Sequence, residues 1–257
     1  MKVVILAGGF GTRISEESHL KPKPMIEVGE APILWHIMKY YSSFGFDEFV
    51  ICCGYKGYVI KEYFADYYLH RSDITFDFSD NNNMIIHNNV AEPWKVTVVD
   101  TGLRTMTGGR LKRVRKYIEN ETFMMTYGDG VSNVDLHALL EFHKKKQKAA
   151  TITAIQPGGR FGVLDIDKER NVNAFSEKAK EDGGWINAGF MVLEPEVFDY
   201  IAGDDTFFER EPLENLARDG KLAAYKHEGF WKCMDTLRDK ETLDYLWNTG
   251  KAKWKCW

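Results

Sequence analysis

The segment KVVILAGGFGTR, from Lys2 to Arg13, places a continuous apolar run directly before a glycine-rich loop. An apolar run of this kind, followed at once by glycines, predicts a buried strand that ends in a tight turn. The glycines at positions 8, 9 and 11 let backbone N–H groups approach a phosphate closely, and the arginine adds a fixed positive charge. The sequence therefore predicts a strand that leads into a phosphate-binding loop.

Strand-like and helix-like patterns alternate after this loop. Residues 31–45 and 58–69 have the apolar spacing of helices, and residues 48–55 form a second apolar run. A β-α-β-α order predicts a parallel sheet with helices on both faces. The short apolar segments 74–78, 84–88 and 95–100 predict an excursion at the edge of that sheet.

The second half of the chain changes character. A helix is predicted over 109–118, a buried strand over 123–127, and a helix capped near Asn133. Further elements are antiparallel strands from Thr151 onward, a helix from Glu196, a strand through 222–234 and a closing helix around 241–250. We expect one domain over 1–257 with an α/β, doubly wound, mostly parallel but mixed Rossmann-like sheet.

Composition limits the partners and the location of the protein. The chain of 257 residues has a formal net charge of −4, which argues against nucleic acid as its main partner. The sequence contains no run of about 18 apolar residues, so it predicts no membrane span. The N-terminus enters a strand directly, which predicts a cytoplasmic protein. The four cysteines have no metal-ligand spacing and are expected to be free thiols.

The glycine-rich loop differs from the two commonest nucleotide motifs. It lacks the third glycine of the dinucleotide fingerprint, because Ile14 stands where that glycine would be, and it lacks the G-K-[ST] ending of a P-loop. A dinucleotide-dependent dehydrogenase is therefore disfavoured.

Three further stretches carry polar groups that suit phosphate chemistry. In KPKP, residues 21–24, the flanking prolines stiffen the backbone around Lys23. In YGDG, residues 127–130, Asp129 follows an apolar strand and has room around it for Mg²⁺ and a substrate phosphate. In FWKCMDT, residues 230–236, Asp235 can supply a second carboxylate.

Together these stretches resemble the sugar-1-phosphate nucleotidyltransferases over nearly the whole chain. The resemblance includes the L-A-G-G-x-G-T-R signature, the P-K-P lysine, the G-D loop, an E-K pair (Glu177 and Lys178) and the late aspartate Asp235. Residues 100–114 and 123–135 resemble the branch of that family that joins CTP to glucose 1-phosphate. The nucleotidyltransferase type of fold is thereby implied, with nucleotide binding over about 1–150 and an antiparallel sugar-binding part over about 151–257.

The resemblance implies a role for each motif residue. Arg13 and Lys23 would be catalytic, and Asp129 and Asp235 would hold Mg²⁺. Sugar-phosphate binding would fall to Glu177, Lys178, Asn187 and Gly189. Nucleotide binding would fall to Leu6, Ala7, Gly8, Gly9, Gly11, Thr12, Arg13, Lys23, Thr105, Gly109, Arg110 and Gly128. By analogy with the family, a homo-oligomer is expected.

Several alternatives stay open at this stage. UTP or dTTP could replace CTP as the nucleotide, because spacing does not identify the groups that read a cytosine edge. A glycosyltransferase that consumes a nucleotide sugar also pairs an α/β sheet with a metal-binding aspartate. A non-catalytic homologue would keep the fold, although such chains usually lose the charged residues that are present here.

Overall fold

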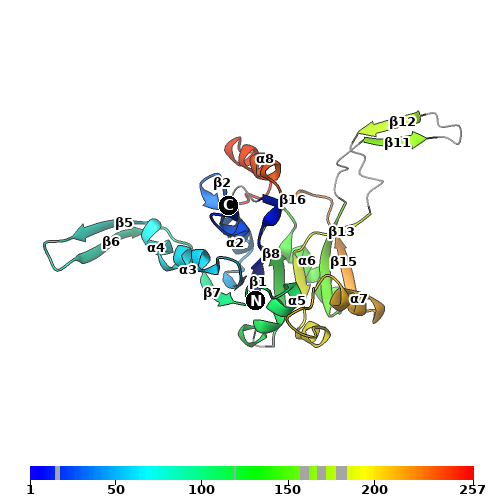
Figure 1. The fold of residues 1–257 in the computed structure, drawn as a ribbon, viewed down its shortest axis with the longest axis horizontal. Helices are drawn as coiled ribbons and strands as arrows, with labels where there is room; N and C mark the ends of the chain where they lie inside the picture. The colour runs from blue at the N-terminus through cyan, green and yellow to red at the C-terminus, as the bar shows by residue number, and fades with distance from the viewer. Residues whose placement is uncertain (15–17, 119, 157–161, 167–171, 178–183) are drawn as a thin grey trace.

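The computed structural model describes residues 1–14, 18–118, 120–156, 162–166, 172–177 and 184–257. Its centre is an eight-stranded mixed sheet within the described residues, in the order β13-β10-β14-β8-β1-β4-β7, with β15 paired to β10 (Figure 1). These strands are β1 (Lys2–Ala7), β4 (Glu48–Cys53), β7 (Lys95–Asp100), β8 (Phe123–Tyr127), β10 (Ala150–Ile155), β13 (Ile186–Asn187), β14 (Met191–Leu193) and β15 (Leu222–Lys226). The predicted α/β fold with a mixed sheet is confirmed.

The two halves of the sheet differ in strand direction. β1 pairs in parallel with both β4 and β8, and β7 continues the parallel half beyond β4. β14 then runs antiparallel to both β8 and β10, and β15 lies parallel to β10. The ends of β1, β4, β7 and β8 therefore share one edge of the sheet, where loops from distant parts of the chain meet.

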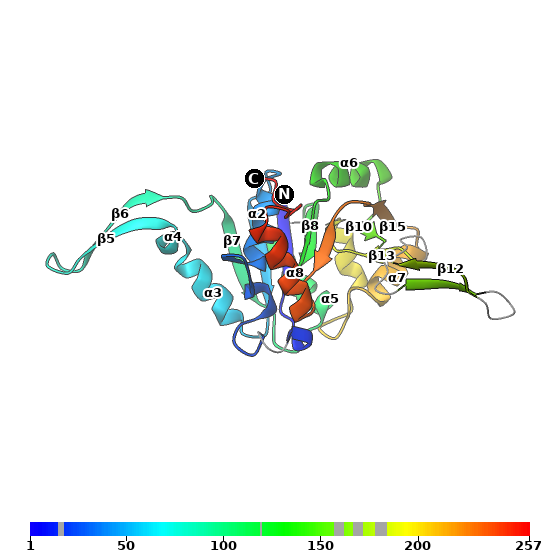
Figure 2. The same cartoon turned by 90° about the horizontal axis from the view of Figure 1, so that it is seen from above.

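Helices cover both faces of the sheet, as the alternation of patterns predicted. They are α2 (Ile33–Ser42), α3 (Gly57–Ala65), α4 (Tyr67–His70), α5 (Thr107–Arg113), α6 (Leu136–Lys146), α7 (Glu211–Arg218) and α8 (Leu237–Asn248). Short 3₁₀ turns are η1 (Thr12–Ile14), η2 (Lys23–Met25), η3 (Arg115–Tyr117) and η4 (Pro195–Tyr200). In Figure 2, α6 lies on one side of the strands and α5 and α7 lie on the other.

Side chains of β1 alternate between two hydrophobic cores. Val3 and Ile5 belong to the core that includes apolar residues of α2 and α6. Val4 and Leu6 belong to the core that includes apolar residues of α5 and α7. Because successive side chains of a strand point to opposite faces, a continuous apolar run is what a strand covered on both faces requires.

In the described parts of the chain, four strand pairs lie outside the main sheet. They are β2 (Glu27–Val28) with β3 (Ala31–Pro32), β5 (Ser72–Asp77) with β6 (Asn83–Asn89), β9 (Gly130–Ser132) with β16 (Trp231–Cys233), and β11 (Gly162–Ile166) with β12 (Val172–Glu177). The β5–β6 hairpin projects from the body of the protein, on the side opposite to β11–β12 (Figure 1). The predicted excursion is therefore a projecting hairpin, and β7 alone of its three strands joins the sheet edge.

Several predicted boundaries were wrong. The helix expected over 109–118 begins at Thr107 and gives way to η3 after Val114. The helix near Asn133 is capped instead by Asp135, whose carboxylate accepts a hydrogen bond from the Ala138 N–H at 2.9 Å. The helix expected from Glu196 is the 3₁₀ turn η4. The single strand expected over 222–234 is two strands in different sheets, β15 and β16.

Within the described residues, every helix is too short or too polar to span a bilayer. All four cysteines are free, as expected, and Cys52 and Cys53 are buried in β4.

Candidate active site

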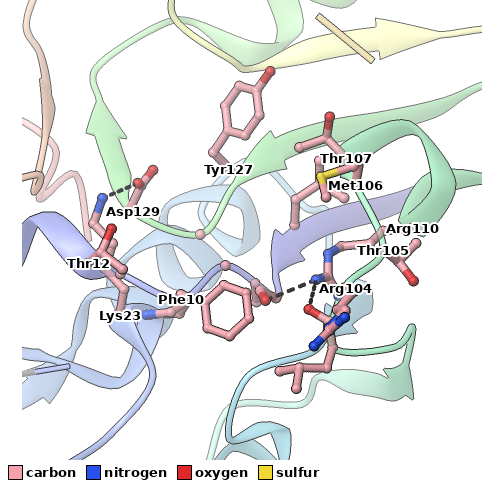
Figure 3. Close-up of a pocket in the computed structure, with 18 of the residues that line it drawn as sticks. Phe10, Thr12, Lys23, Arg104, Thr105, Met106, Thr107, Arg110, Tyr127 and Asp129 are labelled. Carbon is pink, nitrogen blue, oxygen red and sulfur yellow. Dashed lines mark hydrogen bonds and ion pairs between the residues drawn. The ribbon is translucent and has the colours of Figure 1, made fainter. Parts of the chain in front are cut away.

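A cavity of about 470 Å³ opens where the parallel strands end. Its walls include the loop after β1, the loop after β8, residues 103–107 up to the first residue of α5, Lys23 and Pro24 of η2, and Phe207 (Figure 3). Ligands of open α/β sheets bind beyond the carboxyl ends of parallel strands. The cavity lies at that edge, and the glycine-rich loop forms part of its lining.

The first glycine of the loop is required by a neighbouring side chain. A Cβ atom at Gly8 would lie 2.2 Å from a guanidinium nitrogen of Arg110. The same guanidinium donates a hydrogen bond to the Gly8 carbonyl at 3.0 Å. Gly9 is exposed with open space around it, and Gly11 has a φ of +67°, which a side chain would strain. Gly8 and Gly11 are therefore constrained for different reasons, one by a neighbouring side chain and the other by its backbone conformation.

Arg110 ties together the ends of three parallel strands. Its guanidinium donates to the carbonyl of Cys53 at 3.0 Å and to that of Gly102 at 2.7 Å, in addition to Gly8. It also donates to the hydroxyl of Thr101 at 2.9 Å. Arg110 lines the cavity, but these backbone and hydroxyl acceptors already hold most of its N–H groups.

Lys23 lies between two carboxylates at the floor of the site. Its ammonium is 2.5 Å from Asp129 Oδ2 and 2.7 Å from Asp235 Oδ1 (Figure 3 shows the first contact). The other oxygen of Asp235 accepts a hydrogen bond from Arg13 at 2.8 Å. The Lys23 side chain is 11% exposed and that of Arg13 is 72% exposed, so the network runs from the interior to the open mouth.

The pairing of β9 with β16 brings the two aspartates together. Gly130 and Cys233 are partners in that antiparallel pair, and the Met234 N–H donates to the Asp129 carbonyl at 2.9 Å. Asp129 and Asp235 therefore stand at the same end of a two-stranded ribbon, although 106 positions separate them in the chain. Lys23 reaches them from η2, where the preceding Pro22 has an extended backbone.

The ion pairs outweigh the cost of burial. Burial by itself would lower the pKa of Lys23, but the carboxylates of Asp129 and Asp235 raise it above its ordinary value. Burial would likewise raise the pKa of Asp235, yet its contacts with Lys23 and Arg13 hold the pKa below the usual range. The lysine and this aspartate are therefore both charged at neutral pH.

The two carboxylates are suited to a divalent cation. One oxygen of Asp129 and one of Asp235 already lie within 2.7 Å of a single cationic atom, the Lys23 Nζ. Among the described residues, no group of three or more metal-binding side chains occurs. Mg²⁺ is commonly held by one or two carboxylates, with water and substrate phosphate as its remaining ligands, so this donor set fits Mg²⁺.

Most of the predicted nucleotide residues line the cavity. They are Leu6, Ala7, Gly8, Gly9, Gly11, Thr12, Arg13, Lys23, Thr105, Arg110 and Gly128, joined by the predicted metal ligand Asp129. Gly109 lies outside this lining. A Cβ atom there would be 2.5 Å from the Asp204 carbonyl, so this glycine lets α5 pack against the loop of residues 201–210, called the 204 loop below. Asp235 also lies outside the lining and joins the site through Lys23.

The predicted sugar residues are only partly described. Asn187 Nδ2 lies 3.4 Å from the Tyr127 hydroxyl, and Asn187 Oδ1 accepts a hydrogen bond from the Gly189 N–H at 2.9 Å. Both residues are thereby connected to the wall that carries Tyr127. Glu177 is the last residue of β12, and Lys178 lies outside the described residues.

Further residues of the cavity lining were not predicted from the sequence. They are Phe10, Pro24, Leu103, Arg104, Met106, Thr107, Tyr127 and Phe207. Residues 103–107 follow β7 at the same sheet edge, so the rule that singled out the other loops applies to them too. Phe207 carries no such signal, because its segment does not follow a parallel strand and is held against the start of α5 by backbone hydrogen bonds.

The chain is similar to known proteins over its whole length. The nucleotidyl transferase family model matches residues 2–238. Glucose-1-phosphate cytidylyltransferase of Salmonella typhimurium is 58% identical, with 100% of both chains covered. A probable glucose-1-phosphate cytidylyltransferase of Bacillus subtilis is 46% identical, again with 100% of both chains covered.

A solved structure supports the fold independently. The crystal structure of HddC from Yersinia pseudotuberculosis superposes with a TM-score of 0.69 at 26% identity, and the match covers 96% of this chain and 99% of that one. The family model spans the glycine-rich loop, Lys23, Asp129 and Asp235. With this match over most of its length, the chain belongs to the nucleotidyl transferase family.

Proposed function

We propose that the protein transfers the CMP unit of CTP to glucose 1-phosphate, which forms CDP-glucose and releases pyrophosphate. The observation that carries the reaction class is the single ion-pair network of Arg13, Lys23, Asp129 and Asp235 beside the glycine-rich loop. The choice of substrates rests on the full-length similarity to cytidylyltransferases that act on glucose 1-phosphate.

The proposed reaction needs no protein nucleophile. A phosphate oxygen of glucose 1-phosphate attacks the α-phosphorus of CTP, a new P–O bond forms, and the bond to the β-phosphate oxygen breaks with pyrophosphate as the leaving group. The attacking group is already an anion, so the protein must align two phosphates that repel each other and neutralise charge on the leaving group.

The residues of the cavity suit those two tasks. Backbone N–H groups of the glycine-rich loop and the exposed Arg13 would hold the triphosphate. Lys23 would place its ammonium at the α-phosphate, where negative charge accumulates in the transition state. Asp129 and Asp235 would hold Mg²⁺, which supplies charge neutralisation to the phosphates when it is bound.

The remaining predicted residues are assigned to recognition. Leu6, Ala7, Thr12, Thr105, Arg110 and Gly128 would shape the nucleotide pocket, together with Gly109 behind it. Glu177, Lys178, Asn187 and Gly189 would bind the sugar and its phosphate. We further propose that the protein is cytoplasmic and acts as a homo-oligomer, in line with its family.

The proposal is tested by measuring pyrophosphate release with the four nucleoside triphosphates, each combined with several sugar 1-phosphates. The expected result is turnover with CTP and glucose 1-phosphate well above every other pair. Equal turnover of CTP, UTP and dTTP would contradict the choice of CTP but keep the reaction class. Absence of pyrophosphate release with every pair, together with release of a nucleoside diphosphate when a nucleotide sugar is supplied, would favour a glycosyltransferase.

A further inference from the structure

One carboxylate outside the predicted site joins two side chains that line the cavity. Glu209 lies in the segment just before α7 and is partly buried. Its Oε1 accepts a hydrogen bond from the Tyr127 hydroxyl at 2.7 Å, and its Oε2 accepts one from the Thr107 hydroxyl at 2.5 Å. Tyr127 and Thr107 both line the cavity and come from different elements, β8 and α5 (Figure 3).

The Thr107 end of this connection is firmly held. The Thr107 Oγ1 accepts a hydrogen bond from the Phe208 N–H at 2.9 Å while it donates to Glu209. The backbone around it is also paired, because the Gly108 N–H donates to the Thr206 carbonyl at 2.9 Å. The start of α5 and the segment that carries Glu209 are therefore linked both through backbone groups and through side chains.

The Tyr127 end leads to the predicted metal and sugar residues. Tyr127 is the last residue of β8 and stands two positions before Asp129. Its hydroxyl lies 3.4 Å from Asn187 Nδ2, the amide already linked to Gly189. Burial and the neighbouring Glu209 both raise the pKa of Tyr127, so the phenol keeps its proton and remains a donor.

The arrangement explains why this position carries a carboxylate. An ionised carboxylate offers acceptors on both oxygens, so it can receive the two hydroxyl donors at once. A glutamine has one acceptor oxygen and one NH₂ donor, so one of the two hydroxyls would have to reverse its direction. A continuous chain of hydrogen bonds therefore runs from Thr107 through Glu209 and Tyr127 to Asn187.

We propose that Glu209 is a positioning residue that sets the spacing between the nucleotide wall at Thr107 and the Tyr127–Asn187 side of the site. This inference rests on the proposed function, since it assigns those two walls to the two substrates. Glu209 acts through Thr107 and Tyr127. Reaction between two bound substrates is sensitive to small errors in alignment, and this linkage fixes the distance between their walls.

A double-mutant cycle tests the proposal. Thr107→Val and Tyr127→Phe each interrupt the same series of hydrogen bonds. The loss of kcat/KM in the double variant should therefore be smaller, by about threefold or more, than the product of the losses in the two single variants. When the same two substitutions are made in the Glu209→Gln variant, their effects on kcat/KM should simply multiply, because the connection between them is already broken. Glu209→Gln alone should lower kcat/KM for each substrate by about tenfold, the size expected for one lost hydrogen bond to a charged group.

Controls separate positioning from folding. Glu214→Gln changes an exposed acid of α7 and should leave kcat/KM and the thermal midpoint unchanged. If Glu209→Gln fails to fold, the cycle of Thr107→Val and Tyr127→Phe in the otherwise unaltered protein decides the matter. Simple multiplication of their effects in that protein overturns the proposal.

The outcome is also separable from that of the proposed function. The cycle uses whichever nucleotide and sugar phosphate give the highest turnover in the crossed assay. A wrong assignment of CTP would therefore show in the crossed assay, whereas a wrong assignment of Glu209 would show as multiplicative effects in an active protein.

Discussion

At the scale of single residues, Lys23 holds the candidate site together. Its ammonium contacts Asp129 from the middle of the chain and Asp235 from near its end. A buried lysine is tolerated when paired carboxylates compensate for the loss of hydration. The same compensation leaves a cation poised beside the cavity that the glycine-rich loop lines.

Replacement of Lys23 or Asp129 tests the chemistry proposed for this network. We expect Lys23→Ala and Asp129→Asn each to lower kcat by at least about a hundredfold, because loss of one preorganised charge costs roughly 3 kcal/mol in the transition state. Steady-state kinetics measure the effect, with circular dichroism to verify folding. Lys21→Ala is the matched control, since that lysine pairs with the exposed Glu27. Near-normal turnover of either variant would remove its residue from the mechanism.

His36 predicts how stability depends on pH. It is fully buried in α2, and desolvation lowers its pKa to about 4. In the unfolded chain this histidine binds a proton with a pKa near 6.5, whereas in the folded protein it stays neutral down to about pH 4. The free energy of unfolding therefore keeps its full value above pH 6.5 and decreases as the pH falls toward 4. Between pH 7 and pH 5 the loss should be about 2 kcal/mol.

Urea unfolding at the two pH values measures this contribution. His36→Gln removes the titrating ring, so the variant should lose about 2 kcal/mol less than the unaltered protein between pH 7 and pH 5. The comparison between the two proteins cancels carboxylates that titrate in the same range. Identical pH dependence of both proteins would show that His36 does not contribute.

At the scale of elements, Arg110 of α5 connects three strand ends. Its guanidinium donates to backbone carbonyls that follow or end β1, β4 and β7, namely those of Gly8, Cys53 and Gly102. Parallel strands have no direct turn between their ends, so their loops need partners from other elements. This one side chain supplies partners for three of the loops that meet at the cavity edge.

Removal of that guanidinium should destabilise the protein. Arg110→Met removes the hydrogen bonds of the guanidinium to the carbonyls of Gly8, Cys53 and Gly102, and we expect the free energy of unfolding to fall by about 3 kcal/mol. Arg113→Met on the same helix is the control, because its exposed pair with Asp204 should contribute under about 1 kcal/mol. Urea denaturation compares the two variants. Equal losses in both would contradict the role given to Arg110.

At the scale of the whole molecule, one sheet crosses the boundary between the predicted nucleotide and sugar parts. β14 from the second part pairs with β8 from the first, and Met191, Val192 and Leu193 face Met125, Met124 and Phe123 in that pair. Phe123 and Leu193 also share one hydrophobic core. The two parts therefore bury apolar surface against each other and have no separate cores.

A shared core predicts that the protein unfolds as one unit. We expect a single calorimetric transition whose calorimetric and van't Hoff enthalpies agree, because neither part keeps its core alone. Expression of residues 1–150 by themselves should give an unfolded or aggregated chain. Two resolved transitions, or a folded 1–150 fragment, would instead indicate two independent domains.

Removal of the proposed Mg²⁺ should affect activity and leave stability unchanged. The carboxylates of Asp129 and Asp235 are already compensated by Lys23 and Arg13, so the fold does not depend on a further cation. We expect EDTA to abolish turnover without a shift in the thermal midpoint, and added Mg²⁺ to restore it. A large drop in the midpoint on chelation would indicate a structural metal.

Local sequence patterns determined much of this protein. The apolar run before the glycines predicted β1, because burial on both faces demands apolar side chains at successive positions. Lys23 was singled out because the flanking prolines stiffen its backbone, and Asp129 because it follows an apolar strand and stands between two glycines that leave room around it. Each of these signals consists of a few neighbouring residues, so it can be recognised in the sequence without knowledge of the fold.

Only the tertiary structure decided which distant groups meet. The pairing of β9 with β16 places Asp235 beside Asp129, and the 204 loop places Glu209 behind Thr107 and Tyr127. No local pattern distinguishes Glu209 from other acids before a helix. Contacts between segments a hundred residues apart depend on the packing of the whole sheet, which is a property of the folded chain and not of any short stretch.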